Sequence, residues 1–176
     1  LMGWGVAGFR IDAAKHMAVS DLQGILAKAG NPYVYLEVIG AGGEPVQPTE
    51  YLGLGKVTEF NYSYGVSDAF GNGQIKNLKT LGESWGWMPS DKVEVFVVNH
   101  DNERGSAGRT ALTYKAGEKY ELANAFMLAW PYGWPQVFSG YQFNGHDDGA
   151  PRTEGCGQGW NCERRCPTIG NMVMFH

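Results

Sequence analysis

The chain lacks the features that mark membrane-spanning and nucleic-acid-binding proteins. No apolar run approaches the roughly 20 residues that a helix needs to cross a bilayer. Charged residues make up only 18% of the 176 positions, the net charge is −4, and lysine and arginine form no cluster. We therefore expect neither nucleic acid nor an anionic membrane as a partner. No glycine-rich phosphate loop follows any strand-like segment, which argues against a nucleotide-binding sheet.

Glycine and aromatic residues are abundant instead. The chain has 26 glycines and 13% aromatic residues, among them six tryptophans. Shaped loops and flat apolar faces suit sugar rings, although aromatic side chains more often belong to a core. The length and the 43% hydrophobic content fit roughly one domain. Because the chain starts at Leu1 and opens directly into a strand-like segment, we expect it to be a piece of a longer protein.

Strand-like and helix-like segments alternate along the chain. A helix is predicted from Ser20, with Gln23 completing a capping box and Gly30 ending the helix. Further helical patterns occupy 66–82 and 122–130. The predicted strands cover 6–12, 33–39, 56–60, 92–98 and 135–140. This alternation predicts an α/β fold with a parallel sheet and right-handed crossovers.

Polar residues follow three of these strands at their carboxyl ends. Arg10 and Asp12 end the first strand, Glu37 ends the second, and residues 99–101 follow the fourth. In a (β/α)₈ barrel, this rim collects the catalytic groups. A doubly wound sheet also binds ligands there, but the missing phosphate loop makes the barrel the preferred fold.

Asp12, Glu37 and Asp101 are the kind of carboxyl groups that glycoside hydrolysis requires. One ionised carboxylate attacks the anomeric carbon while a protonated one donates to the leaving oxygen. Arg10, on the same strand face as Asp12, would keep Asp12 ionised, and the apolar neighbours of Glu37 suit an acid. Plainer interpretations exist: Asp12 as a helix N-cap, Glu37 as a charge in solvent, and 99–102 as a simple turn.

The same segments resemble conserved regions of the α-amylases, in the large clan of starch-acting glycoside hydrolases (family 13). "GFRIDAAKH" resembles the second conserved region of that family, "EVIG" the third and "FVVNHDNERG" the fourth. The similarity extends over essentially the whole chain and is greatest to the subgroup with animal, actinobacterial and marine bacterial members. It includes "GGEPVQPTEY", "GKVTEF", "GESWGWMPSD", "FMLAWPYGWPQVFSGY" and "CGQGWNCERR".

The resemblance implies retaining endo-hydrolysis of α-1,4-glucosidic bonds in starch and glycogen. Asp12 would be the nucleophile, Glu37 the general acid/base, and Asp101 the third carboxylate, which binds and distorts the sugar. Arg10 would position Asp12. A transglycosylase or maltogenic enzyme of the same clan, and a non-catalytic glucan-binding relative, remain alternatives.

Three further residues would contact substrate by this resemblance. His100 would bond the sugar in the cleavage subsite, and Lys15 and His16 would contact glucose units on the leaving-group side. The backbone carbonyl of His16 would also bind a structural calcium ion, a hard cation that accepts carbonyl oxygens. The other calcium ligands belong to segments of the family that this chain does not contain.

The resemblance also implies that residues 1–176 are part of a catalytic domain. Strands 4 to 8 of the barrel are expected here, without the first three strands, the calcium-bearing inserted domain and the C-terminal β-domain. An open half-barrel exposes two strand edges, so we expect the isolated chain to be inactive. The full-length protein is expected to be a monomer.

Several positions depart from the family pattern. Many members of the subgroup bind chloride through an Arg, an Asn and a second Arg or Lys. Arg10 and Asn99 match the first two, and within "SGYQF" the third position is assigned to Gln142, which makes chloride binding doubtful. Val98 replaces a common aspartate, which is expected to loosen the surroundings of the catalytic turn. Gly40 stands where "EVID" is frequent.

The three cysteines indicate a compartment. Cys156 and Cys162 match a disulfide of the family, which suits a secreted protein, with two free thiols as the alternative. Zinc is not expected, because no histidine lies at ligand spacing. Cys166 stands where the family usually has tryptophan, and the sequence offers no account of it.

Overall fold

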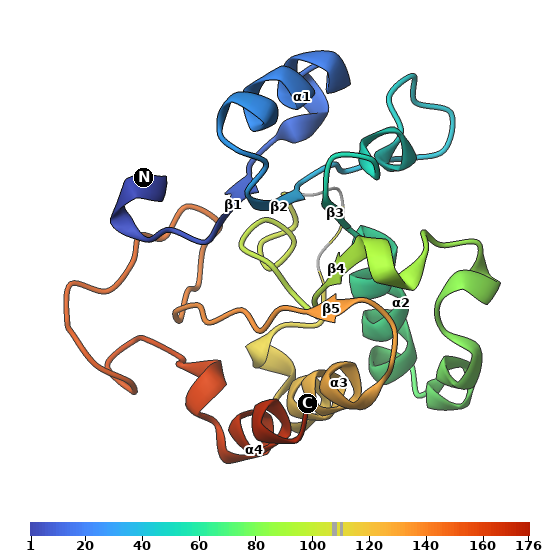
Figure 1. Ribbon diagram of the computed structural model, residues 1–176. Coiled ribbons are helices and arrows are strands. Elements are labelled where there is room, and N and C mark those ends of the chain that lie inside the picture. The colour runs from blue at the N-terminus through green and yellow to red at the C-terminus, as the bar shows by residue number, and fades with distance from the viewer. Residues whose placement is uncertain (107–108, 110) are drawn as a thin grey trace.

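A parallel five-stranded sheet forms the centre of the computed structural model, which describes residues 1–106, 109 and 111–176. The strands pair in chain order, each parallel to the next (Figure 1). They are β1 (Gly8–Ile11), β2 (Tyr33–Leu36), β3 (Lys56–Thr58), β4 (Val93–Val95) and β5 (Trp134–Pro135). Neighbouring parallel strands in chain order are the arrangement of consecutive barrel units, which confirms the predicted architecture.

In the described part of the chain four α-helices lie around the sheet, with α1 beside β1 and β2 and with α3 against α4 (Figure 1). They are α1 (Val19–Lys28), α2 (Phe60–Gly71), α3 (Glu118–Ala129) and α4 (Pro167–Phe175). Short 3₁₀ helices connect the main elements: η1 (Met2–Trp4), η2 (Ala14–His16), η3 (Pro48–Tyr51), η4 (Ile75–Thr80), η5 (Glu83–Trp85), η6 (Ser90–Lys92), η7 (Tyr114–Ala116) and η8 (Glu163–Arg165). Within the described residues, no helix has the length and apolar character that crossing a bilayer requires.

Element boundaries differ from the sequence expectation in instructive ways. The capping box at Ser20 is wrong: α1 starts one residue earlier, and its N-cap, Ala18, has no side chain that can cap. Helix α2 begins at Phe60 because the Glu59 side chain accepts a hydrogen bond from the backbone N of Asn61 at 3.1 Å. Strand β5 has only two residues instead of the predicted six, and α4 was not expected.

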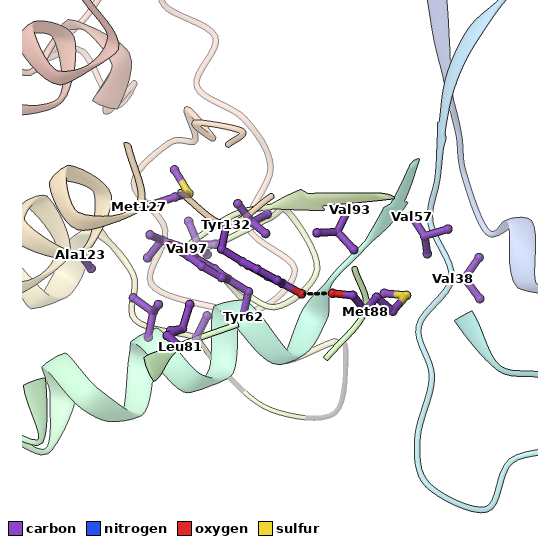
Figure 2. Packing of buried hydrophobic residues seen from close by; sticks show 14 of the residues in the cluster. Val38, Val57, Tyr62, Leu81, Met88, Val93, Val97, Ala123, Met127 and Tyr132 are labelled. Atoms are coloured by element: carbon purple, nitrogen blue, oxygen red, sulfur yellow. Dashed lines mark hydrogen bonds between the residues drawn. The ribbon is translucent and has the colours of Figure 1, made fainter. Parts of the chain in front are cut away.

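The core lies between the strands and helices α2 and α3. All residues of β4 are buried, as expected for a parallel strand covered on both faces, whereas β2 buries only Val34 and Leu36 and β3 buries its last two residues. The ring of Tyr62 from α2 stacks on Tyr132, with centroids 6.1 Å apart, and the Tyr132 hydroxyl donates to the Met88 carbonyl at 2.7 Å (Figure 2). These contacts fix α2 to the segment that enters β5.

Gly24 and Gly30 provide a test of where α1 ends. Gly24 lies exposed inside the helix, where an added Cβ would meet nothing within 4 Å, whereas Gly30 follows the helix at φ +83°. We expect Gly24→Ala to raise the free energy of unfolding by about 0.5–1 kcal/mol and Gly30→Ala to lower it by about 1 kcal/mol. Unfolding followed by circular dichroism measures both. An equal response of the two variants would contradict the helix boundary.

Candidate active site

Arg10 joins the two carboxyl groups that follow strands β1 and β2. Its Nη1 donates to Asp12 Oδ1 at 2.5 Å, and its Nη2 donates to Glu37 Oε1 at 2.5 Å. The second oxygen of Glu37 accepts from the backbone N of Ala13 at 3.0 Å. Because β1 and β2 pair in parallel, the residues after each strand lie at the same edge of the sheet. The arginine thereby orients both groups at once.

The two carboxyl groups differ in their surroundings. Asp12 has 68% of its side chain exposed, and the hydrogen bond and charge of Arg10 lower the pKa of Asp12. The Glu37 side chain is only 7% exposed, so its interpretation as a charge in solvent is wrong. Its setting is not purely apolar either, since both oxygens accept hydrogen bonds. Asp12 is not an N-cap of α1, which starts after Ala18.

The turn after β4 brings His100 to the same place. Polar atoms of Asp12, Glu37 and His100 lie within 4.8 Å of one another, and Asp101 Oδ2 is 3.5 Å from His100 Nε2. The Asn99 side chain forms this turn by accepting from the backbone N of residue 101 at 3.2 Å and of residue 102 at 2.9 Å. The segment is therefore a turn, as its composition suggested, and it also carries site residues.

Acid–base chemistry fits this cluster better than a metal does. Asp12, Glu37 and His100 form the one group of potential metal ligands found among the residues that the structure describes. However, Arg10 already pairs with both carboxyl groups, and its positive charge would repel an added cation.

A cleft of about 470 Å³ opens beside Glu37. Lys15 and His16, predicted from the sequence to contact sugar, line it together with Glu37. The Lys15 ammonium forms an ion pair with Glu44 from the loop after β2, which sequence reasoning did not single out. Aromatic rings of Phe60 and Tyr64 also line the cleft. The cleft offers both the polar groups and the ring faces that bind sugars.

The backbone around His16 is held by a buried tyrosine. The Tyr51 hydroxyl is 2.9 Å from the Met17 carbonyl and 3.3 Å from the Lys15 carbonyl. A backbone carbonyl at His16 has the chemistry of a calcium ligand. One carbonyl does not make a site, and no second ligand for it is assigned within the described ranges.

A second cavity, of about 180 Å³, corrects one sequence assignment. It is lined by Arg10, Asn99 and Gln136, whereas Gln142 lines a different cavity near α3 and α4. The backbone N of Gln142 donates to the Gly159 carbonyl at 2.7 Å, which places Gln142 beside the loop that the disulfide encloses. The assignment of the third chloride position to Gln142 is therefore wrong. Gln136 is the glutamine that shares a cavity with Arg10 and Asn99, and its polarity in a strand-like segment was the available signal.

The lining of this cavity does not fit a chloride ion. The fully buried Glu94 accepts from Gln136 Nε2 at 2.9 Å and from the Tyr33 hydroxyl, and burial raises the pKa of Glu94 despite these hydrogen bonds. Among the lining residues, Arg10 is the one fixed cation, and it already pairs with two carboxyl groups. Glu94, a charged residue inside the hydrophobic strand β4, was the sequence signal for this cavity.

The structure also locates the remaining unusual positions. A Cβ on Gly40 would lie 2.4 Å from Pro48 Cδ, so this backbone leaves no room for the aspartate common in the family. Val98 is buried and lines the second cavity. Cys156 and Cys162 form the expected disulfide, and Cys166 is a half-buried free thiol.

Comparison with known proteins finds relatives among curated sequences and solved structures but not among family models. No family model matches the chain. The α-amylase of Aeromonas hydrophila is 59% identical over 99% of this chain and 41% of its own length, and that of Streptomyces violaceus is 46% identical over 99% and 31%.

Solved structures agree with these relatives. A mutant of α-amylase I from Eisenia fetida, crystallised as a maltohexaose complex, superposes with a TM-score of 0.90 at 39% identity, over 99% of this chain and 42% of that one. Both kinds of comparison therefore make this chain a homologue of the α-amylases, and it spans 31% to 42% of the length of these relatives.

Proposed function

We propose that this chain supplies the catalytic carboxyl groups of an α-amylase, which hydrolyses α-1,4-glucosidic bonds in starch and glycogen with retention of configuration. The observation that carries the proposal is the Arg10 guanidinium, which holds an exposed Asp12 and a buried Glu37 side by side. The naming of its homologues as α-amylases supports the same reaction.

The roles follow from the surroundings of each group. Asp12, kept ionised by Arg10, attacks the anomeric carbon while Glu37 gives its proton to the departing glycosidic oxygen. In the second step Glu37 takes a proton from water, which displaces Asp12 from the covalent glycosyl intermediate. One carboxylate oxygen of Asp12 and one of Glu37 lie within 4.8 Å of each other. This is near the ~5–5.5 Å between the carboxyl groups of retaining enzymes and below the ~6.5–9.5 Å of inverting ones.

The neighbouring residues would bind the glucan. We assign His100 and Asp101 to the sugar at the cleavage point, and Lys15 and His16 to glucose units on the leaving-group side, because the latter two line the cleft beside Glu37. The maltohexaose in the related structure supports a linear glucan as substrate. Nucleic acid and membrane are not proposed as partners.

The whole protein would be larger than this chain. We propose that residues 1–176 form the last five strands of the catalytic barrel and that the whole protein is a monomer. The disulfide favours a secreted protein. Calcium, with the His16 carbonyl as one ligand, would stabilise that protein. No catalytic step described above requires it.

A chimera tests the catalytic roles. This chain replaces the matching segment of the Aeromonas hydrophila α-amylase, to which it is 59% identical. We expect the chimera to hydrolyse starch with retention, and Glu37→Gln to lower kcat by about 10²–10⁴-fold, because the leaving oxygen loses its proton donor. The exposed Glu154→Gln is the matched control. Longer or cyclic products would favour a transglycosylase, and an active Glu37→Gln variant would refute the assigned role.

The isolated chain should be inactive, because β1 and β5 are the outer strands of an open sheet. A circular dichroism melt with a parallel starch assay measures this. Detectable hydrolysis by the 176-residue chain would show that the half-barrel closes or pairs, and would contradict this expectation.

Chloride should not activate the chimera, since Arg10 is already paired and Gln136 is neutral. We expect less than about a twofold rise of kcat with added NaCl, because one shared cation gives little net attraction for an anion. Gln136→Arg, which adds a cation to the cavity, is expected to create a chloride response, and Gln142→Arg is not. Strong activation of the unsubstituted chimera would contradict the expectation.

A further inference from the structure

Two buried carboxyl groups meet at Gly140, outside the candidate active site. Glu103, in the loop after β4, is 5% exposed, and Glu163, at the start of η8, is 6% exposed. The backbone N of Gly140 donates to Glu163 Oε2 at 3.0 Å. A Cβ on Gly140 would lie only 3.1 Å and 3.2 Å from the two oxygens of Glu103. Glycine thus lets both carboxyl groups approach one backbone position.

Neither carboxyl group has a full set of partners. Glu103 Oε1, Glu163 Oε1 and the hydroxyl of Tyr120 from α3 are buried without a hydrogen bond among the described residues. An unpaired buried carboxylate is costly, and two neighbouring ones repel each other. Burial and the charge of Glu163 therefore raise the pKa of Glu103 to about 7.

Two cations lie nearby but make their recorded contacts elsewhere, and Arg104 Nη2 is itself buried without a hydrogen-bond partner among the described residues. Arg104 and Lys115 act against this shift, but neither forms an ion pair with Glu103 within the described part of the chain. Arg104 Nη1 donates to the carbonyls of residue 146 at 2.6 Å and residue 148 at 2.9 Å. The Lys115 ammonium lies 3.8 Å from the centre of the Phe143 ring. Both side chains bind the segment after β5 rather than Glu103.

Glu103 is also tied to the turn that carries the site residues. Its backbone N donates to the Asn99 carbonyl at 3.0 Å, across the turn that presents His100 and Asp101. Gly140 belongs to the segment after β5, so Glu103 connects that segment with the turn after β4.

We propose that Glu103 is a positioning residue whose neutral form holds the His100–Asp101 turn against Gly140 and Glu163, and whose ionisation loosens this contact. The catalytic consequence rests on the proposed function, but the effect on stability does not. Glu163 lies next to Glu103, on the same backbone position, Gly140. The other charged or titratable side chains near Glu103 in the described residues are Tyr120, Arg104 and Lys115.

The sign of the pH dependence follows from the raised pKa. The unfolded chain loses the Glu103 proton near its ordinary pKa of 4.5, and the folded chain loses it near 7. The stabilisation is therefore complete below about pH 4.5 and is lost as the pH rises to about 7. Glu103→Gln keeps a neutral side chain of the same shape at every pH, so it should lack this loss.

The experiment measures urea unfolding of the same chimera between pH 4 and pH 9, with kcat and KM at each pH. Relative to Glu103→Gln, the folded-to-unfolded ratio of the parent should fall by about 100-fold between pH 4.5 and pH 8. Glu163→Gln removes the neighbouring charge and should shrink that fall. The alkaline limb of kcat should move to higher pH in Glu103→Gln with KM little changed. Glu154→Gln, an exposed surface change, should behave as the parent.

Each outcome decides the proposal. Identical pH dependence of unfolding in the parent and Glu103→Gln would overturn it. A difference in unfolding without a shift of kcat would overturn the positioning role. If the folded chimera lacks activity, the proposed function fails, and the unfolding curves still decide whether Glu103 holds its proton.

Discussion

The hydrogen bonds from one guanidinium to two carboxyl groups organise the candidate site. Arg10 donates from two different nitrogens to Asp12 and Glu37, which follow adjacent parallel strands. A planar fork with fixed donor directions sets both positions, which the single point charge of lysine does not do. Of the two carboxyl groups that this cation binds, one is exposed and the other is buried. An acid and a nucleophile need different surroundings of this kind, because they must differ in protonation at the same pH.

The surrounding fold keeps this arrangement in place through loops fixed by buried groups. Tyr51 holds the backbone on either side of His16, and Asn99 closes the turn that presents His100. The stacked rings of Tyr62 and Tyr132 anchor α2 beside the strands that support these loops. The site is thus built on strand ends and completed by loops whose positions depend on the core.

The extent of the sheet explains why a larger protein is proposed. In the described sheet β1 and β5 each have one neighbour, and a closed barrel has no such edges. The relatives are more than twice as long as the segment they share with this chain. The added chain would supply the neighbours of both edges.

The sequence alone determined the parallel α/β order and the rim position of Arg10, Asp12 and Glu37, because strand alternation and strand ends are local properties. It did not place Gln136 with Arg10, nor Glu103 beside Glu163, because these pairs come from distant segments that only packing brings together. The start of α2 was missed for a similar reason, because its cap, Glu59, is also held by the backbone N of the distant residue Met88. Local pattern fixes which residues lie at a strand end, and tertiary structure decides which of them meet.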